Sequence, residues 1–251
     1  MKRTAAALLR LGLLLIIGLL ALQIYFGLRI MLMNWVAPQS SSFQRSEIWR
    51  LAVDKQQVLW SQQWVDAAML GNQLKRAVIA SEDAGFVDHG GVEWDAMEKA
   101  WERNQREAPR TVKRSQAKPA AAAKPPPAAK VVGGSTITQQ LAKNMLLSGE
   151  RNFARKAQEF VITLMLEAAL SKRRILEIYL NNVEWGEGLF GAQAAARHYF
   201  RIDARQLNAE QAARLAVMLP APKRFEKRPA SPYLLSRAAV IEARMGGVEV
   251  P

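Results

Sequence analysis

An apolar run near the N-terminus, residues 11–28, constrains this chain more than any other feature. Its 18 residues carry no charge. As a helix they would span about 27 Å, close to the ~30 Å hydrocarbon core of a bilayer. A cleaved signal peptide is one alternative, but no small-x-small cleavage site follows the run. A buried core helix is another, but we would not expect one that is apolar on every face at the extreme N-terminus. We therefore predict a single transmembrane anchor over residues 11–33.

The charges that flank the run predict its orientation. Lys2, Arg3 and Arg10 precede it and favour a cytoplasmic segment over residues 1–10, although Arg29 directly after the run weakens this preference. Residues 34–251 would then form one domain on the outer side of the membrane, because roughly 100–200 residues usually make one domain.

The composition narrows the partners and the kinds of site. Lys and Arg number 35 against 22 Asp and Glu, a net charge of +13. Such an excess favours a polyanionic partner, which could be a nucleic acid, an anionic membrane surface or a phosphorylated substrate. The chain has no cysteine and two histidines, His89 and His198, so disulfides are excluded and a metal site built from several histidines nearly so.

The apolar periodicity beyond residue 63 predicts a mainly α-helical domain. Residues 34–63 are harder to assign, and 45–53 could form a helix or a strand. No strand pattern or internal repeat is visible. One long helix is expected over 154–181, with Val161, Leu164, Met165 and Ala168 on its buried face. Helices are also expected over residues 74–81, 92–103, the end of 133–144, 192–199, 209–219 and 233–245.

Residues 105–130 differ from the rest of this domain. The stretch 118–127 consists of lysine, alanine and proline, and Glu107 is the one acidic residue between 103 and 130. Such low-complexity composition cannot bury a core. Since it lies inside the domain, we interpret it as an inserted loop rather than a domain boundary.

Two acidic residues stand where a predicted helix ends. Glu82 and Asp83 precede Gly85 and Phe86. An acid beside an aromatic ring in a loop can have its pKa raised by desolvation, which suits a general base near neutral pH. A solvated surface pair is the simpler alternative, and spacing alone favours it.

A polar Gly-Gly-Ser-Thr segment at 133–136 leads into the next helix, and Lys143, Arg151, Arg155 and Lys156 follow. Backbone N–H groups at the start of a helix, together with these cations, could bind a pyrophosphate. The alternative is an ordinary helix cap with a solvated basic face. The spacing is not that of a nucleotide P-loop.

Glu159 lies four residues after Arg155 and three after Lys156. This spacing suits a surface ion pair on a helix. It would also suit a second carboxylate facing Glu82 across a cleft, because sugar chemistry commonly uses two carboxylates.

Five ordered segments, within about residues 74–244, resemble the motifs of glycosyltransferase family 51, and in it the monofunctional biosynthetic peptidoglycan transglycosylases. They are 82–91 (E-D-x-x-F-x-x-H-x-G), 133–144 (G-x-S-T-I-T-Q-Q-L-x-K-N), 155–159 (R-K-x-x-E), 171–181 and 188–200. The resemblance implies a lysozyme-like glycosyltransferase fold with a larger lobe and a membrane-proximal jaw lobe. The chain ends soon after Arg244, which we take to leave no room for a transpeptidase domain.

The resemblance also implies the chemistry. Lipid II would be polymerised into β-1,4-linked glycan strands with inversion, releasing undecaprenyl pyrophosphate. Glu82 would be the general base, and Glu159 would assist the leaving group directly or by holding a divalent cation, Mg or Mn. No organic cofactor is expected. The expected substrate-binding residues are Asp83, Phe86, His89, Ser135, Thr136, Gln139, Gln140, Lys143, Asn144, Arg151, Arg155 and Lys156.

The implied location is the bacterial inner membrane, with the N-terminus cytoplasmic and the catalytic domain periplasmic. Expected partners are lipid II, the growing glycan chain, inner-membrane lipids and cell-division or elongation proteins, and not nucleic acid. Two rival functions explain less of the sequence. A hydrolytic lysozyme-like enzyme would not need cations for a pyrophosphate, and a non-catalytic basic membrane protein would leave the segment 135–140 unexplained.

Overall fold

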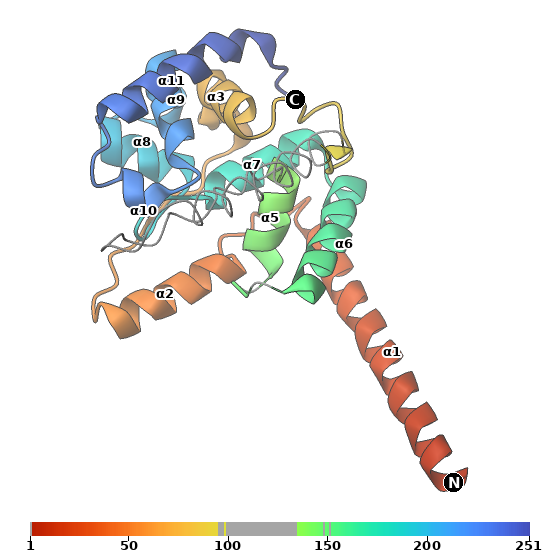
Figure 1. Cartoon of the computed structure of the whole chain (residues 1–251). Helices are drawn as coiled ribbons and strands as arrows, with labels where there is room; N and C mark the ends of the chain where they lie inside the picture. The colour runs from red at the N-terminus through yellow and green to blue at the C-terminus, as the bar shows by residue number, and fades with distance from the viewer. Residues whose placement is uncertain (1, 95–97, 99–134, 148, 151) are drawn as a thin grey trace, which may run out of the picture.

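The computed structural model describes residues 2–94, 98, 135–147, 149–150 and 152–251 (Figure 1). The predicted insert over 105–130 and most of the helix predicted over 92–103 therefore lie outside the described residues, as do Gly133, Gly134 and Arg151.

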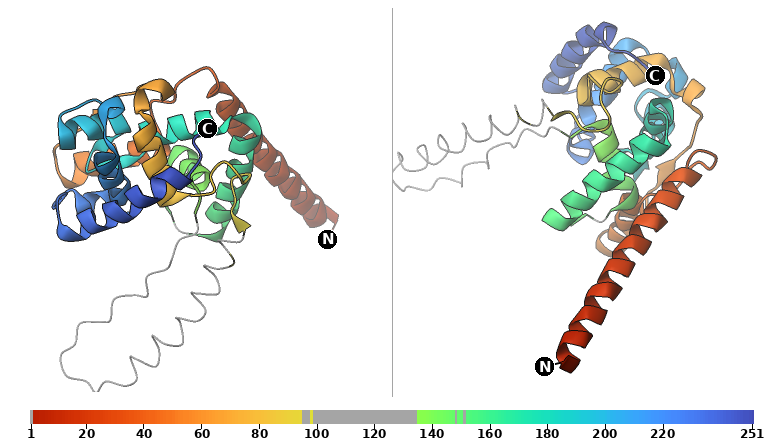
Figure 2. Two further views of the ribbon diagram at one scale, coloured as in Figure 1. Left: turned by 90° about the horizontal axis from the view of Figure 1, so that it is seen from above. Right: turned by 90° about the vertical axis from the view of Figure 1, so that its right-hand side faces the viewer.

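The N-terminal helix α1 (Lys2–Leu32) extends away from the rest of the molecule (Figures 1 and 2). Its segment Ala6–Leu32 has a mean hydropathy of 2.4 and is long and apolar enough to cross a membrane. It is the one such helix among the described residues. This fits the single-pass anchor predicted from the sequence.

The C-terminal turns of α1 pack against the rest of the domain. Phe26, Ile30 and Met33 are buried in the same hydrophobic core as the rest of the molecule. One turn before them, the side-chain amides of Gln23 and Gln158 exchange two hydrogen bonds, each of 2.9 Å. The anchor is thus packed against helix α6 (Phe153–Ala169).

The rest of the described chain is mainly helical, as predicted. The further helices are α2 (Ser42–Asp54), α3 (Asn72–Glu82), α5 (Ile137–Leu146), α7 (Lys172–Asn182), α8 (Ala192–Phe200), α9 (Ala209–Met218), α10 (Pro222–Phe225) and α11 (Pro232–Arg244), with 3-10 turns η1 (Ala67–Leu70), η2 (Ala204–Gln206) and η3 (Met245–Gly247). The helices predicted over 74–81, 192–199, 209–219 and 233–245 are confirmed to within a few residues. In the undecided region, 45–53 is part of α2, whose start is fixed by a capping box between Ser41 and Gln44.

Two groups of helices divide the domain. Helices α3, α9 and α11 pack against one another at one end, and α5 packs against α2, α6 and α7 (Figure 1). The C-terminus of α3 reaches the N-terminus of α5, so residues far apart in the sequence meet there.

The long helix predicted over 154–181 is wrong in two respects. It breaks at Leu170 and Ser171, because the Ser171 side chain accepts a hydrogen bond from the backbone N–H of Arg174 and begins α7 as a new helix. The buried residues of α6 are Glu159, Ile162, Thr163 and Leu166, whereas Val161, Leu164 and Ala168 of the predicted face are exposed.

The domain also contains short strands, for which no pattern is visible in the sequence. A small sheet joins β1 (Ser61–Gln62), β3 (Leu189–Phe190) and β2 (Glu184–Gly186) in the order β1-β3-β2, with β1 parallel and β2 antiparallel to β3. Strands of two or three residues are too short to show an alternating pattern. Gly188 permits the close pairing, because it has a φ of 69° and a Cβ there would lie 1.9 Å from the carbonyl oxygen of Leu59.

Candidate active site

The two neighbouring acids at the end of α3 point to different partners. Asp83 is buried, and its Oδ2 accepts a hydrogen bond of 2.9 Å from the backbone N–H of Ile137, at the start of α5. Its Oδ1 lies 2.7 Å from Nε2 of His89. The Nδ1 atom of His89 accepts from the backbone N–H of Gly91 at 3.0 Å, so Nε2 carries the proton and donates it to Asp83. Asp83 therefore joins the loop after α3 to α5.

Three other residues expected to bind substrate lie in the same internal framework. Thr136 is buried, caps α5 and donates a hydrogen bond of 2.6 Å from Oγ1 to the carbonyl of Gly91. Phe86 is fully buried, with the ammonium group of Lys172 4.6 Å from its ring centre. Gln139 closes the capping box with Thr136. Apart from Gln139, which also reaches the cavity described below, this geometry favours a structural role for the set Asp83, Phe86, His89 and Thr136.

Glu82 is half-buried, and its Oε1 accepts a hydrogen bond of 3.4 Å from the hydroxyl of Ser81. Its Oε2 accepts a hydrogen bond of 2.9 Å from Nε2 of Gln140. Burial raises the pKa of Glu82 above its ordinary value, and the charge of Asp83 adds to this rise. The hydrogen bonds from Gln140 and Ser81 and, more weakly, the charge of Lys143 oppose it. A carboxylate with a raised pKa can accept a proton near neutral pH.

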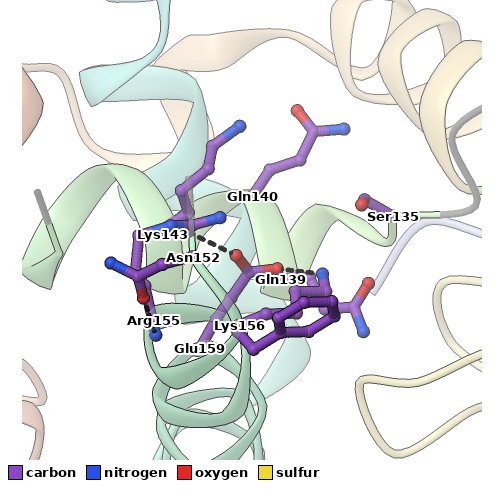
Figure 3. A pocket seen from close by; sticks show the side chains of 9 residues that line it. Ser135, Gln139, Gln140, Lys143, Asn152, Arg155, Lys156 and Glu159 are labelled. Carbon is purple, nitrogen blue, oxygen red and sulfur yellow. Dashed lines mark hydrogen bonds and ion pairs between the residues drawn. The ribbon is translucent and has the colours of Figure 1, made fainter. Parts of the chain in front are cut away.

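A cavity of about 690 Å³, seen from close by in Figure 3, is lined in part by Gln140, the hydrogen-bond partner of this carboxylate. Its walls come from α5 and the N-terminal half of α6. The lining residues are Ser135, Gln139, Gln140, Lys143, Asn152, Phe153, Arg155, Lys156 and Glu159. Gln140 thus lines the cavity and contacts Glu82 at the same time.

Two of these lining residues were not predicted. Asn152 is the N-cap of α6, with its side chain accepting a hydrogen bond of 2.7 Å from the backbone N–H of Arg155. An asparagine just before a helix is a recognisable start signal, so Asn152 could have been placed from the sequence. Phe153 is 97% exposed, and nothing in its spacing marks it as part of a site.

Glu159 is buried between two cations. Its Oε2 accepts a hydrogen bond of 2.8 Å from Arg155, and its Oε1 accepts one from Lys156 (Figure 3). The spacing predicted these pairs, but as surface contacts. Together with Lys143, the two cations give the cavity a positive charge that a single carboxylate only partly offsets, as binding of a pyrophosphate requires.

The residues around Glu159 do not fit a divalent cation. Mg²⁺ and Mn²⁺ need several free oxygen ligands, and both Glu159 oxygens are taken by Arg155 and Lys156. Within the described ranges, no group of three or more His, Cys, Asp or Glu side chains could hold a metal ion.

A second hollow of about 340 Å³ adjoins the first and shares Gln140, Lys143 and Arg155 with it. Asn144 lines this second hollow. Glu184 lines it too, and burial raises the pKa of this carboxyl to about 7 although the ammonium group of Lys223 lies 3.4 Å away.

A desolvated carboxylate next to a cationic cavity, on a helical domain packed onto a helix long and apolar enough to cross a membrane, is typical of an enzyme that transfers a group from an anionic donor. Residues 52–246 match the family model described as Transglycosylase. The chain belongs to the transglycosylase family.

Similar proteins agree with this assignment over nearly the whole chain. A protein of Paraburkholderia xenovorans (strain LB400), named biosynthetic peptidoglycan transglycosylase, is 47% identical over 96% of this chain and 92% of its own length. Proteins with the same name from Burkholderia pseudomallei (strain K96243) and Cupriavidus metallidurans (strain ATCC 43123 / DSM 2839 / NBRC 102507 / CH34) are each 49% identical, over 92% and 94% of this chain and 83% and 95% of their own lengths.

Proposed function

We propose that this chain is a peptidoglycan glycosyltransferase that polymerises lipid II into β-1,4-linked glycan strands, with Glu82 as the general base. The family and the names of the similar proteins support the activity. One observation carries the assignment of the base: Gln140 both donates to Glu82 and lines the cationic cavity. A proton acceptor and a binding site for an anionic leaving group therefore lie side by side.

The proposed reaction is a single displacement. Glu82 takes the proton from the GlcNAc 4-hydroxyl of the acceptor lipid II while that oxygen attacks the anomeric carbon of the growing chain. The bond from this carbon to the pyrophosphate oxygen breaks, so undecaprenyl pyrophosphate leaves and the α linkage becomes β. Glu82 then returns its proton to solvent.

The cations of the cavity act on the leaving group. Negative charge grows on the pyrophosphate as its bond breaks, and fixed positive charges that face it stabilise the transition state. Lys143 and Arg155 line both hollows and are the first candidates for this contact. Glu159 holds Arg155 and Lys156 in place, which assigns it a positioning role. A divalent cation would have to take most of its ligands from the substrate and water, and no step is assigned to it.

The proposal includes the location and the partners. With α1 in the inner membrane and its N-terminus in the cytoplasm, the domain would meet lipid II at the outer surface of that membrane. Cell-division or elongation proteins are the proposed protein partners, and co-purification from solubilised membranes would test them.

Replacement of Glu82 by Gln tests the function. The change keeps the shape and removes the base, so polymerisation of labelled lipid II should fall about 10²–10⁴-fold while lipid II still binds. The matched control is Glu242→Gln on the exposed face of α11, which should keep the wild-type rate. Retention of more than about a tenth of the rate in Glu82→Gln would contradict the role of the base, and shortening of preformed strands instead of growth would favour the hydrolytic alternative.

A further inference from the structure

The side-chain amide of Gln140 lies between two groups and uses both of its ends. Its Nε2 donates to Oε2 of Glu82 at 2.9 Å, and its Oε1 accepts from the hydroxyl of Tyr179, on α7, also at 2.9 Å. Tyr179 is 1% exposed, so water does not replace this contact. A chain of hydrogen bonds therefore runs from the buried core of α7 to the candidate base.

Rotation of this amide by 180° would reverse both contacts. The oxygen of Gln140 would face the Glu82 carboxylate, and two acceptors would repel each other. The amide nitrogen would face Tyr179, whose proton would lose its acceptor, at a cost because the phenol is buried. The rotated amide would suit Glu82 in one state only, the protonated one, in which the carboxyl could donate to it. Tyr179 thus penalises the arrangement that favours a protonated Glu82.

We propose that Tyr179 is a positioning residue that fixes the Gln140 amide with its N–H toward Oε2 of Glu82, and thereby keeps Glu82 ionised and able to receive the acceptor's proton. The proposal rests on the proposed function, because it concerns the same base. It assigns a task to a residue that touches neither the cavity nor the substrate.

The other charges around Glu82 act alongside this chain of hydrogen bonds. Asp83 next to it disfavours the ionised form, and Lys143 across the cavity favours it. Tyr179 itself stays neutral, because burial and the nearby Glu82 raise its pKa well above the ordinary value. The phenol therefore remains a donor at every pH at which the enzyme works.

The pH dependence of kcat/KM for lipid II polymerisation tests the proposal. In Tyr179→Phe the amide is free to rotate, so the acid limb of the profile should move upward by about half to one pH unit. Activity should fall about 3–10-fold on the acid side of the limb and stay near the wild-type value on the alkaline plateau. A merely structural role would instead lower activity by the same factor at every pH.

Tyr199→Phe is the matched control. Its hydroxyl also makes one hydrogen bond, of 2.9 Å to the carbonyl of Trp185, and is partly buried, but it has no contact with Gln140. This variant should lower the melting temperature by about as much as Tyr179→Phe does, and it should leave the acid limb of the pH profile in place. A limb that moves equally in both variants would overturn the proposal.

A second pair of variants separates this mechanism from a folding defect. Gln140→Met removes the donor to Glu82 and should move the limb at least as far as Tyr179→Phe does. In the Gln140→Met background, Tyr179→Phe should produce no further shift, because Tyr179 acts through Gln140. Additive shifts, or an unmoved limb in Tyr179→Phe, would overturn the proposal. A wrong assignment of the base would be recognised separately, because Glu82→Gln would then retain activity and show the same acid limb as the wild type.

Discussion

Asp83→Asn should reveal how differently two adjacent acids are used. Asp83 accepts from two donors, the backbone N–H of Ile137 and Nε2–H of His89. The proton on Nε2 is fixed because Nδ1 is occupied by the N–H of Gly91. An asparagine offers one oxygen and one NH₂ group, so in either orientation a donor meets a donor. One charge-assisted hydrogen bond, worth about 1.5–3 kcal/mol, is lost, and one buried donor is left unsatisfied at about 1–3 kcal/mol.

The combined cost is about 2.5–6 kcal/mol of the free energy of unfolding. For a domain of this size, that lowers the melting temperature by roughly 5–24 °C. The assay is the apparent melting temperature of the full chain in detergent, with Glu82→Gln as the neighbouring control. Because Glu82→Gln removes a desolvated charge, its melting temperature should be no more than about 2 °C below that of the wild type, or should exceed it. A wild-type melting temperature for Asp83→Asn would refute the argument that Asp83 holds the loop to α5.

Three further predictions concern charge and topology. Arg155→Ala should weaken use of the pyrophosphate-linked donor by about 1.5–3 kcal/mol, measured as kcat/KM, and a change in acceptor use of the same size would contradict its assignment. Burial raises the pKa of Glu184 to about 7. The folded state gains stability from the neutral carboxyl in full below the unfolded pKa near 4.5, and this stability is lost as the pH rises through 7. Glu184→Gln should therefore raise the melting temperature by several degrees at pH 8 and leave it unchanged at pH 4. A reporter fused after Pro251 should be active only if it functions outside the cytoplasm, and a reporter active only inside would overturn the proposed orientation.

The sequence predicted elements well where one face of a helix is apolar and the other polar. Helices α9 and α11 are of this kind, and their ends carry recognisable caps at Asn208 and Ser231. It failed on α6, which has apolar side chains on two faces, so periodicity could not decide whether Leu164 or Leu166 is buried. Ser171 is a recognisable helix cap, but the apolar positions on both sides of it indicated one continuous helix.

For the site, too, the sequence predicted some features and not others. The motif residues Gln140, Lys143, Arg155 and Glu159 do meet in one cavity. A motif does not say which of its members face the substrate, however, and Asp83, Phe86 and Thr136 are buried beneath the surface. The contact between Tyr179 and Gln140 joins residues 39 positions apart in the sequence, and such pairing depends on how α5 and α7 pack.

The packing of α1 has a mechanical consequence for an enzyme whose substrate is a lipid. Since Phe26, Ile30 and Met33 are part of the core, we expect the domain to tilt together with α1 rather than to rotate freely on it. A helix leans further in a thinner bilayer to keep its apolar length covered. With α1 in the bilayer as proposed, the height and orientation of the cavity above the headgroups would then depend on the bilayer thickness. We therefore expect the acyl-chain length of the host membrane to affect how readily a lipid-linked sugar reaches Glu82.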